Sequence, residues 1–513
     1  MTRVKPGQRQ RARAPKVRTG CRTCKVKCDE ARPACRRCSS TGRMCDGYDV
    51  IAEVTSRRSP LSGARALVEH PAVAIPTLTR TSAELRSLQF YIEKTVGQLT
   101  TFFPDELWTT AVIRLAQSET GISHALVALS SYHECYISPQ QCDNRDTSFA
   151  LREYNLAIKD HLKATQIYPS APISSISLVT CLIFTCIEIL RSNYDAAMRL
   201  FLIGHQLIQQ CLQRAEANSE SESGPTSGGL DDIIRIVQPS FVRLAIQSSV
   251  LVGDVDPLIG LEAVPAFNLP SLPLEAASFE SLVEAREALV FLAVDCMRAS
   301  RARVTEYSMI SRRLEQWTRA FDAFVVCRSA TLEATAQRRG VALVRLQQRY
   351  LALKVGTANF EGVTGSSAGG VYAGPFSEMI EDAAIALGFD PAEEESWEKQ
   401  LEPVQTRFHM DIGAIPILFS ISARCRDPKI RRKAIALMRN ASIQDGLWPS
   451  VLAAEVAERI MELEETEMSH RESLYSVSTE VRVRSIALTE IKEKGAVVQY
   501  GLYDSSRQEH ISW

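Results

Sequence analysis

Residues 21–45 of this 513-residue chain read CRTCKVKCDEARPACRRCSSTGRMC and hold six of its 14 cysteines. The spacing is C-x2-C-x3-C-x6-C-x2-C-x6-C. Two thiolates separated by two residues can bind one ion from a single turn, and two such pairs close together are typical of zinc sites. The candidate metal ligands are Cys21, Cys24, Cys28, Cys35, Cys38 and Cys45. Because so short a segment cannot bury a core of its own, we predict a module that folds only with its metal.

The number of thiolates indicates two zinc ions per chain. Two tetrahedral ions need eight ligand contacts, and six thiolates supply them only if two sulfurs bridge both ions. The stretch contains no histidine that would offer a different ligand set. Seven Lys and Arg residues lie between the cysteines, where they offset the negative charge of the cluster and lower the thiol pKa values.

A disulfide-rich secreted module is the alternative interpretation of the cysteines. It would need a signal peptide, and residues 1–20 contain no apolar run. The other cysteines are scattered, mostly in apolar surroundings, which is typical of a reducing compartment. They are Cys135, Cys142, Cys181, Cys186, Cys211, Cys296, Cys327 and Cys425.

The charge of the chain is divided between a basic N-terminus and an acidic remainder. Residues 1–45 hold 14 Lys and Arg against Asp29 and Glu30, a net charge of +12. Since the whole chain is −1, the remainder carries −13. This pattern favours a nucleic-acid-binding head on an interaction or regulatory region. Residues 1–20 are expected to be a basic arm that contacts phosphates or serves as a nuclear import signal.

Residues 19–48 (TGCRTCKVKCDEARPACRRCSSTGRMCDGY) resemble the zinc binuclear cluster of fungal transcription factors. The resemblance implies that Cys21 and Cys35 bridge the two zinc ions. Cys24 and Cys28 would complete one site, and Cys38 and Cys45 the other. It further implies a nuclear regulator of RNA polymerase II genes, of a metabolic or secondary-metabolite pathway. Its partner would be double-stranded DNA with GC-rich half-sites, bound as a monomer or homodimer.

The resemblance and the charge pattern give four candidate DNA contacts, Arg18, Arg22, Lys25 and Lys27. The family usually has six residues between its second and third cysteines, and this chain has three. Nearly one helical turn that carries basic residues is therefore missing. Zinc ligation survives, because an i,i+4 pair still shares one helical face. Either base readout is weakened, which favours a regulator that acts through a partner protein, or the assigned coding sequence lacks three codons.

The remaining chain is predicted to be mostly α-helical. Residues 46–80 are interpreted as a linker, 81–475 as a helical regulatory region and 476–513 as a C-terminal hairpin segment. Ser82 is expected to cap the first helix, and amphipathic patterns cover about 122–136, 147–165, 176–191 and 194–212. Helices are expected again from about Leu230 and over 276–355. Loose segments are expected at 216–229, 256–273 and 361–375, and strands around Val481–Val483 and Val497–Tyr500, with the turn at Lys494-Gly495.

The body also resembles the regulatory region of the same fungal family, in residues 149–162, 177–204 and 425–465. Residues 178–190 are apolar but too short for a membrane span, so they predict a buried core helix. No phosphate loop, dinucleotide fold, nucleophile elbow or metalloprotease motif is present, so no enzyme is expected. His133 and Glu134 are predicted to pack or cap a helix. The acidic stretch 377–402 is a candidate for contact with transcriptional coregulators.

Overall fold

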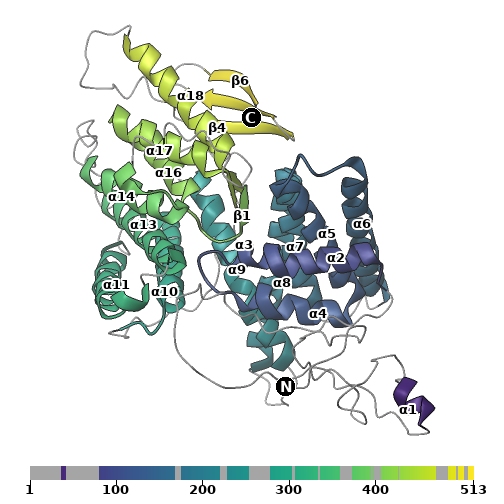
Figure 1. Cartoon of the computed structure of the whole chain (residues 1–513). Helices are drawn as coiled ribbons and strands as arrows, with labels where there is room; N and C mark the ends of the chain where they lie inside the picture. Colours follow the sequence, from purple (N-terminus) through teal and green to yellow (C-terminus); the bar gives the residue numbers. More distant parts are fainter. Residues whose placement is uncertain are drawn as a thin grey trace, which may run out of the picture. The chain divides into compact units, whose positions relative to one another are not determined.

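The computed structural model describes residues 36–41, 80–167, 175–219, 228–252, 278–302, 307–332, 335–358, 373–393, 397, 406–425, 427–469, 483, 485–492, 495–501 and 506–512. The chain divides into two compact units, Met1–Pro71 and Ala72–Trp513. In the first unit the described residues form one short helix, α1 (Arg36–Ser40). All other described elements belong to the second unit, and most of them are helices (Figure 1).

The second unit begins with a group of packed helices. They are α2 (Ser82–Phe90), the π-helix η1 (Tyr91–Thr95), α3 (Val96–Leu99), the π-helix η2 (Leu107–Ala111), α4 (Val112–Ser118), α5 (Thr120–Ile137), α6 (Asn144–Ile167), α7 (Ser175–Leu190) and α8 (Tyr194–Ser219). Helix α5 packs on α6 and α7, and α7 packs on α8. The four amphipathic ranges predicted between residues 122 and 212 are thus confirmed as α5 to α8.

The cap of the first helix lies one residue before the predicted one. The Thr81 hydroxyl accepts the backbone N–H of Glu84 at 3.3 Å, and the Glu84 carboxylate accepts the backbone N–H of Thr81 at 2.8 Å. The two residues form a capping box, which satisfies two N–H groups that the first turn leaves unpaired. Ser82 is the first helical residue and not the cap, so that prediction was wrong by one position.

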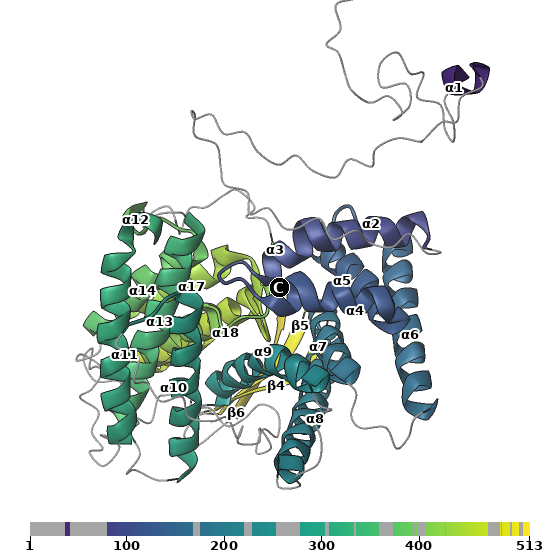
Figure 2. The same cartoon turned by 90° about the horizontal axis from the view of Figure 1, so that it is seen from below.

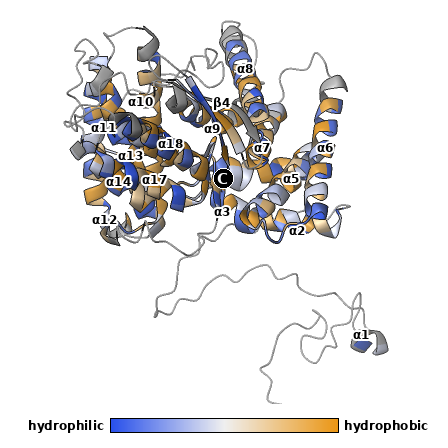
Figure 3. Ribbon diagram, turned by 90° about the horizontal axis from the view of Figure 1, so that it is seen from above, coloured by the Kyte–Doolittle hydropathy of each residue, from blue (hydrophilic) through white to orange (hydrophobic). Residues whose placement is uncertain are grey.

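Helix α7 is the buried core helix that its apolar sequence predicts. Leu178, Ile183 and Ile187 have no exposed surface. The Thr185 hydroxyl is also enclosed and donates to the carbonyl of Cys181 at 2.7 Å, so its burial leaves no polar group unsatisfied. Hydrophobic colouring predominates along α7, whereas hydrophilic and hydrophobic residues alternate along α6 and α8, which face water on one side (Figure 3).

Among the described helices, none combines the length and the apolar character that crossing a bilayer would require.

A second group of helices follows in the same unit. It consists of α9 (Gly228–Val252), α10 (Leu282–Ala302), α11 (Tyr307–Cys327), α12 (Ser329–Leu332), α13 (Thr335–Ala358), α14 (Ala373–Leu387) and the 3-10 helix η4 (Pro391–Glu393). Figures 1 and 2 show α9 between the first group and the other helices of the second group. It contacts α7 and α8 on one side and α10 on the other. The helices expected from about Leu230 and over 276–355 are confirmed as α9 to α13.

The edges of two predicted loose segments are helical. Helix α8 continues to Ser219 and α9 begins at Gly228, so the segment expected at 216–229 is shorter than predicted. Helix α14 begins at Ala373, inside the segment expected at 361–375. The interiors of both segments, and the whole of 256–273, lie outside the described residues.

A small sheet joins the last helices to the earlier ones. Strand β1 (Arg407–His409) pairs in parallel with β2 (Ile443–Asp445), which pairs antiparallel with β3 (Trp448–Pro449). The last helices are α16 (Ile415–Arg424), α17 (Pro428–Ala441) and α18 (Ser450–Ser469); α16 and α18 contact the sheet, and α17 packs on both of them. Gly446, between β2 and β3, has φ +53°, and an added Cβ would lie 1.9 Å from Oε1 of Gln247 in α9. Only glycine fits this turn.

The C-terminal residues form three antiparallel strands instead of a two-stranded hairpin. They are β4 (Ser485–Lys492), β5 (Gly495–Gly501) and β6 (Ser506–Ser512), with β5 in the centre. The predicted hairpin is confirmed as β4 and β5, which pair antiparallel from Lys492 opposite Gly495 to Ser485 opposite Gly501. The first strand lies beyond the predicted Val481–Val483, and β6 was not predicted. Buried side chains of β5 such as Val498 pack on the face of α18 that contains Leu452 and Val456.

Candidate nucleic-acid interface and the core of the helical region

Of the predicted metal ligands and DNA contacts, only Cys38 lies among the described residues. Helix α1 begins at Arg36, directly after Cys35, and places Cys38 in its first turn. The backbone N–H and the hydroxyl of Thr41 both donate to the carbonyl of Cys38, at 3.2 and 3.3 Å, and close the end of the helix. Cys38, the second cysteine of the C-x2-C pair, therefore lies in a helical turn.

The burial of Cys38 fits a zinc ligand. Only 1% of this residue is exposed, although it lies in a five-residue helix within a segment rich in charge. A metal ion would neutralise a thiolate enclosed in this way, and Zn²⁺ prefers thiolate ligands. The residue type and the burial at position 38 therefore both fit a zinc ligand.

Five ligands lie outside the described residues, and so do the four candidate DNA contacts. They are Cys21, Cys24, Cys28, Cys35, Cys45, Arg18, Arg22, Lys25 and Lys27. Their roles remain predictions, as do the boundaries of the arm, the zinc module and the linker.

In the helical unit, His133 is a packed residue, as predicted. It has no exposed surface, and its Nδ1 lies 2.9 Å from the hydroxyl of Thr95. Its Nε2 lies 3.1 Å from Oε1 of Gln98, which also accepts the backbone N–H of Phe408 at 2.7 Å. Burial lowers the pKa of His133 to about 4, so the ring is neutral at pH 7. Its role is to link α5, the first helices and β1.

A second histidine, His124, lies beside two carboxylates. The three residues are far apart in the sequence, so their spacing did not predict this group. Nδ1 of His124 is 2.7 Å from the fully buried carboxylate of Glu153, and Glu84 completes a group whose ligand atoms lie within 4.8 Å of one another. The hydrogen bond to Glu153 raises the pKa of His124. Arg152 pairs with the other Glu153 oxygen at 2.9 Å, and Glu84 serves in the capping box. Protein partners satisfy these groups, so we interpret them as a structural link between α2, α5 and α6.

A buried charge network connects distant parts of the helical unit. Arg243 of α9 pairs with Asp105 at 2.8 Å and with Glu287 of α10 at 3.2 Å. Arg286 of α10 pairs with Asp411, which follows β1, and with Glu287. Although burial raises the pKa of Asp411, the charges of Arg286 and Arg243 hold it below its usual range. Removing one partner would leave a buried charge uncompensated, so the network fixes the junction of α9, α10 and β1.

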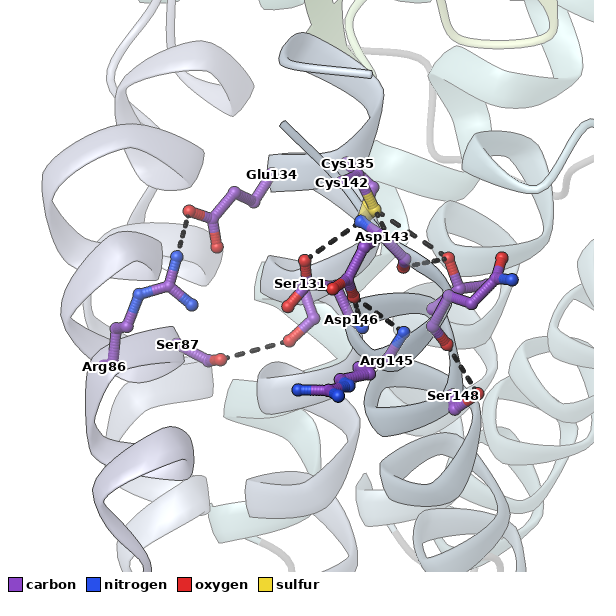
Figure 4. The surroundings of a disulfide bond; sticks show 12 residues. Arg86, Ser87, Ser131, Glu134, Cys135, Cys142, Asp143, Arg145, Asp146 and Ser148 are labelled. Atoms are coloured by element: carbon purple, nitrogen blue, oxygen red, sulfur yellow. Dashed lines mark hydrogen bonds and ion pairs between the residues drawn. A yellow bond between two sulfur atoms is a disulfide. The ribbon is translucent and has the colours of Figure 1, made fainter. Parts of the chain in front are cut away.

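The structure also contains a disulfide that the sequence did not predict. Cys135, near the end of α5, is bonded to Cys142, which precedes α6. Figure 4 shows the bond beside Asp143, whose carboxylate accepts the backbone N–H groups of Arg145 and Asp146 at the start of α6. The cysteine pattern had indicated reduced thiols throughout, and for this pair the structure differs because the α5–α6 turn brings the two residues together.

Comparison with known proteins identifies both parts of the chain. Residues 19–53 match the fungal Zn(2)-Cys(6) binuclear cluster domain, and residues 86–316 match the fungal specific transcription factor domain. An aspercryptin biosynthesis cluster-specific transcription regulator of Emericella nidulans is 23% identical over 87% of this chain and 87% of its own length. No solved structure gives a significant match.

Two further relatives match shorter parts of the chain. A transcription regulator of Purpureocillium lilacinum is 28% identical over 43% of this chain and 52% of its own length. A Zn(2)-C6 fungal-type transcription factor of Aspergillus fumigatus is 32% identical over 28% of this chain and 40% of its own length.

A six-cysteine zinc module joined to a large helical unit defines a DNA-binding transcription regulator. The chain belongs to the fungal zinc binuclear cluster transcription factors, with the fungal specific regulatory domain that accompanies the cluster in this family.

Proposed function

We propose that this transcription factor acts in the nucleus, binds two zinc ions through its six N-terminal cysteines and controls the genes of one biosynthetic pathway. The observation that carries the zinc part is the enclosed Cys38 thiol in the turn that follows Cys35. The pathway part is supported by the relative from Emericella nidulans, which is named as a biosynthesis cluster-specific regulator and spans most of this chain.

The proposed DNA contact uses the basic residues around the cluster. Lys25 and Lys27 lie between the second and third cysteines, and Arg22 lies between the first two. Arg and Lys side chains bind guanine edges in the major groove, so GC-rich half-sites suit them. Arg18 and the arm before it would contact phosphates, which adds affinity without sequence preference.

A binding assay on the full, zinc-loaded chain tests the proposal. At near-physiological salt, DNA with CGG half-sites should bind about a thousandfold more tightly than a scrambled duplex of the same length. Varying the half-site spacing, together with sedimentation of the complex, separates a monomer from a homodimer. Equal affinity for both duplexes, with a steep salt dependence, would contradict direct base readout.

The second candidate function is regulation through a partner protein. The three-residue spacing between Cys24 and Cys28 favours it, because a shorter segment offers fewer basic side chains to the bases. In that case the zinc content would be normal, and occupancy of genomic sites would depend on a second DNA-binding protein. Mapping bound sites in cells and sequencing the transcript across Cys24–Cys28 distinguishes the two candidates.

A further inference from the structure

Basic side chains from two elements gather around Phe102, in the loop that precedes η2. The guanidinium carbon of Arg339, in α13, lies 5.4 Å from the centre of the Phe102 ring. The ring of His409, in β1, packs edge-on against the same phenyl ring at 5.2 Å. Arg407 lies two positions before His409 on β1, and residues two apart project to the same side of a strand. We call Arg339, Arg407 and His409 the basic cluster.

Several N–H donors of the basic cluster have no acceptor. Nε of Arg339 donates to the carbonyl of Ala386 at the end of α14, and Nη2 of Arg407 donates to the carbonyl of Ala441 at the end of α17. Nη2 of Arg339 and Nε of Arg407 are buried N–H donors without a hydrogen-bond partner. The ring nitrogens of His409 are also buried without one; only one nitrogen of the neutral ring carries a proton, and Nδ1 lies 3.7 Å from the Asp445 carboxyl. Buried polar groups are nearly always paired, so unpaired donors in one place indicate a missing acceptor.

A matched arrangement on the same helix shows what the basic cluster lacks. Arg345, also in α13, lies 5.5 Å from the ring centre of Phe321 and forms an ion pair with Asp322 at 2.9 Å. Arg339 lies over Phe102 in the same way. Within the described part of the chain, neither it nor Arg407 forms an ion pair with a carboxylate.

The positive charges of the basic cluster also repel one another. Burial, with the charge of Arg339 added, lowers the pKa of Arg407 to about 10. Burial is the main cause that lowers the pKa of His409 to about 4, and both arginines lower it further, while Asp411 acts in the opposite direction. The site therefore holds two cations, a neutral imidazole and, 3.7 Å from that imidazole, the carboxyl of Asp445, whose pKa burial raises to about 8. An anion would stabilise the two cations.

We propose that the basic cluster is a binding site for an oxyanion, the carboxylate or phosphate group of a small molecule. Guanidinium groups bind such groups with two parallel hydrogen bonds, and the neutral His409 adds one N–H donor. Arg339 and Arg407 each keep part of their surface exposed, although the unpaired Nη2 and Nε atoms are buried, so an anion would approach from the exposed side of the two guanidinium groups. The bound anion would link α13 to β1. This site lies in the helical unit and does not depend on the proposed DNA contacts.

Thermal unfolding of the full zinc-loaded chain tests the proposal. Sodium phosphate and sodium succinate are each compared with sodium chloride at equal ionic strength. All five tryptophans lie beyond residue 100, so their fluorescence reports on the second unit. We expect phosphate, succinate or both to raise the midpoint, which identifies the preferred oxyanion, while chloride does not. Calorimetric titration should give one site per chain.

Three variants assign the effect to residues. Arg339→Gln and Arg407→Gln should each weaken binding about 10- to 100-fold, because each removes charge-assisted hydrogen bonds. Arg345→Gln, from the matched pair, should bind the anion as the unmodified chain does. If a Gln variant does not fold, Arg407→Lys keeps the charge, loses the planar fork and should show intermediate binding. Absence of binding to the folded chain, or unchanged binding in folded Arg339→Gln and Arg407→Gln, overturns the proposal.

Discussion

The two units of this protein are stabilised by different means. The N-terminal unit has an array of cysteines and many charges, and its described helix spans five residues. The second unit has one large apolar core that runs from Leu88 to Met461. We propose that metal ligation stabilises the short charged segment, whereas burial of apolar surface stabilises the helical region. The two units should consequently respond to different perturbations, and four variants, with one control variant, examine that difference.

The largest expected effect follows the loss of one thiolate. Cys38→Ala should abolish DNA binding and reduce bound zinc below two ions per chain, since structural zinc contributes about 10–16 kcal/mol to the folding of such modules. Metal analysis and a DNA-binding assay measure both effects. The tryptophan unfolding midpoint should not change. Cys327→Ser, at an exposed position on α11, is the control and should retain both zinc ions. Two zinc ions in Cys38→Ala would exclude Cys38 as a ligand.

A core substitution in the second unit should lower the stability of that unit without changing the zinc content. Trp317 is fully buried, stacks on Phe321 and donates Nε1–H to the carbonyl of Ala285 at 3.0 Å. Trp317→Ala should reduce the free energy of unfolding by about 3–5 kcal/mol, measured by urea titration with the remaining tryptophans as the probe. Zinc content should stay at two. A loss of zinc in this variant would show that the units do not fold independently.

The next expected effect concerns DNA contact within the zinc module. Lys27→Ala should weaken binding to a CGG-containing duplex by about 1–3 kcal/mol without any loss of zinc, because the side chain contacts DNA and not the metal. Comparison of specific and scrambled duplexes shows whether the lost contact is to a base or to a phosphate. If affinity for both duplexes is unchanged, the shortened Cys24–Cys28 segment makes no DNA contact.

The smallest expected effect is a pH dependence of the second unit. The pKa of His133 is about 4 in the folded state and about 6.5 in the unfolded chain. Between these values only the unfolded chain binds the proton, so stability is complete above pH 6.5 and falls as the pH decreases. The protonation of His133 in the unfolded chain should lower the free energy of unfolding by about 2 kcal/mol between pH 7 and pH 5. His133→Gln stays neutral, so its free energy of unfolding should decrease by about 2 kcal/mol less than that of the unmodified chain over this interval. If the free energy of unfolding changes equally with pH in both proteins, the lowered pKa of His133 is contradicted.

The structure shows why some features could be predicted and others could not. Helices α5 to α8 were predicted well because each carries its own apolar period over 16 residues or more. Strand β1 has three residues and pairs with β2, 36 positions away, so neither carries a recognisable pattern. The cap at Thr81 was misplaced by one position because Thr81 and Ser82 are both good caps, and the reciprocal bond to Glu84 decides between them.

The sequence by itself determined the zinc chemistry and the type of protein. The identity and spacing of candidate ligands are local properties of the sequence. The charge difference between two parts of a chain likewise follows from the sequence without knowledge of the fold. Tertiary structure alone decided which distant side chains meet. It placed Arg339 and His409 against the same ring of Phe102, bonded Cys135 to Cys142, and buried Arg243 against Asp105. The physical reason is that pairing and desolvation depend on distance in space, which helix packing sets and residue spacing along the chain does not.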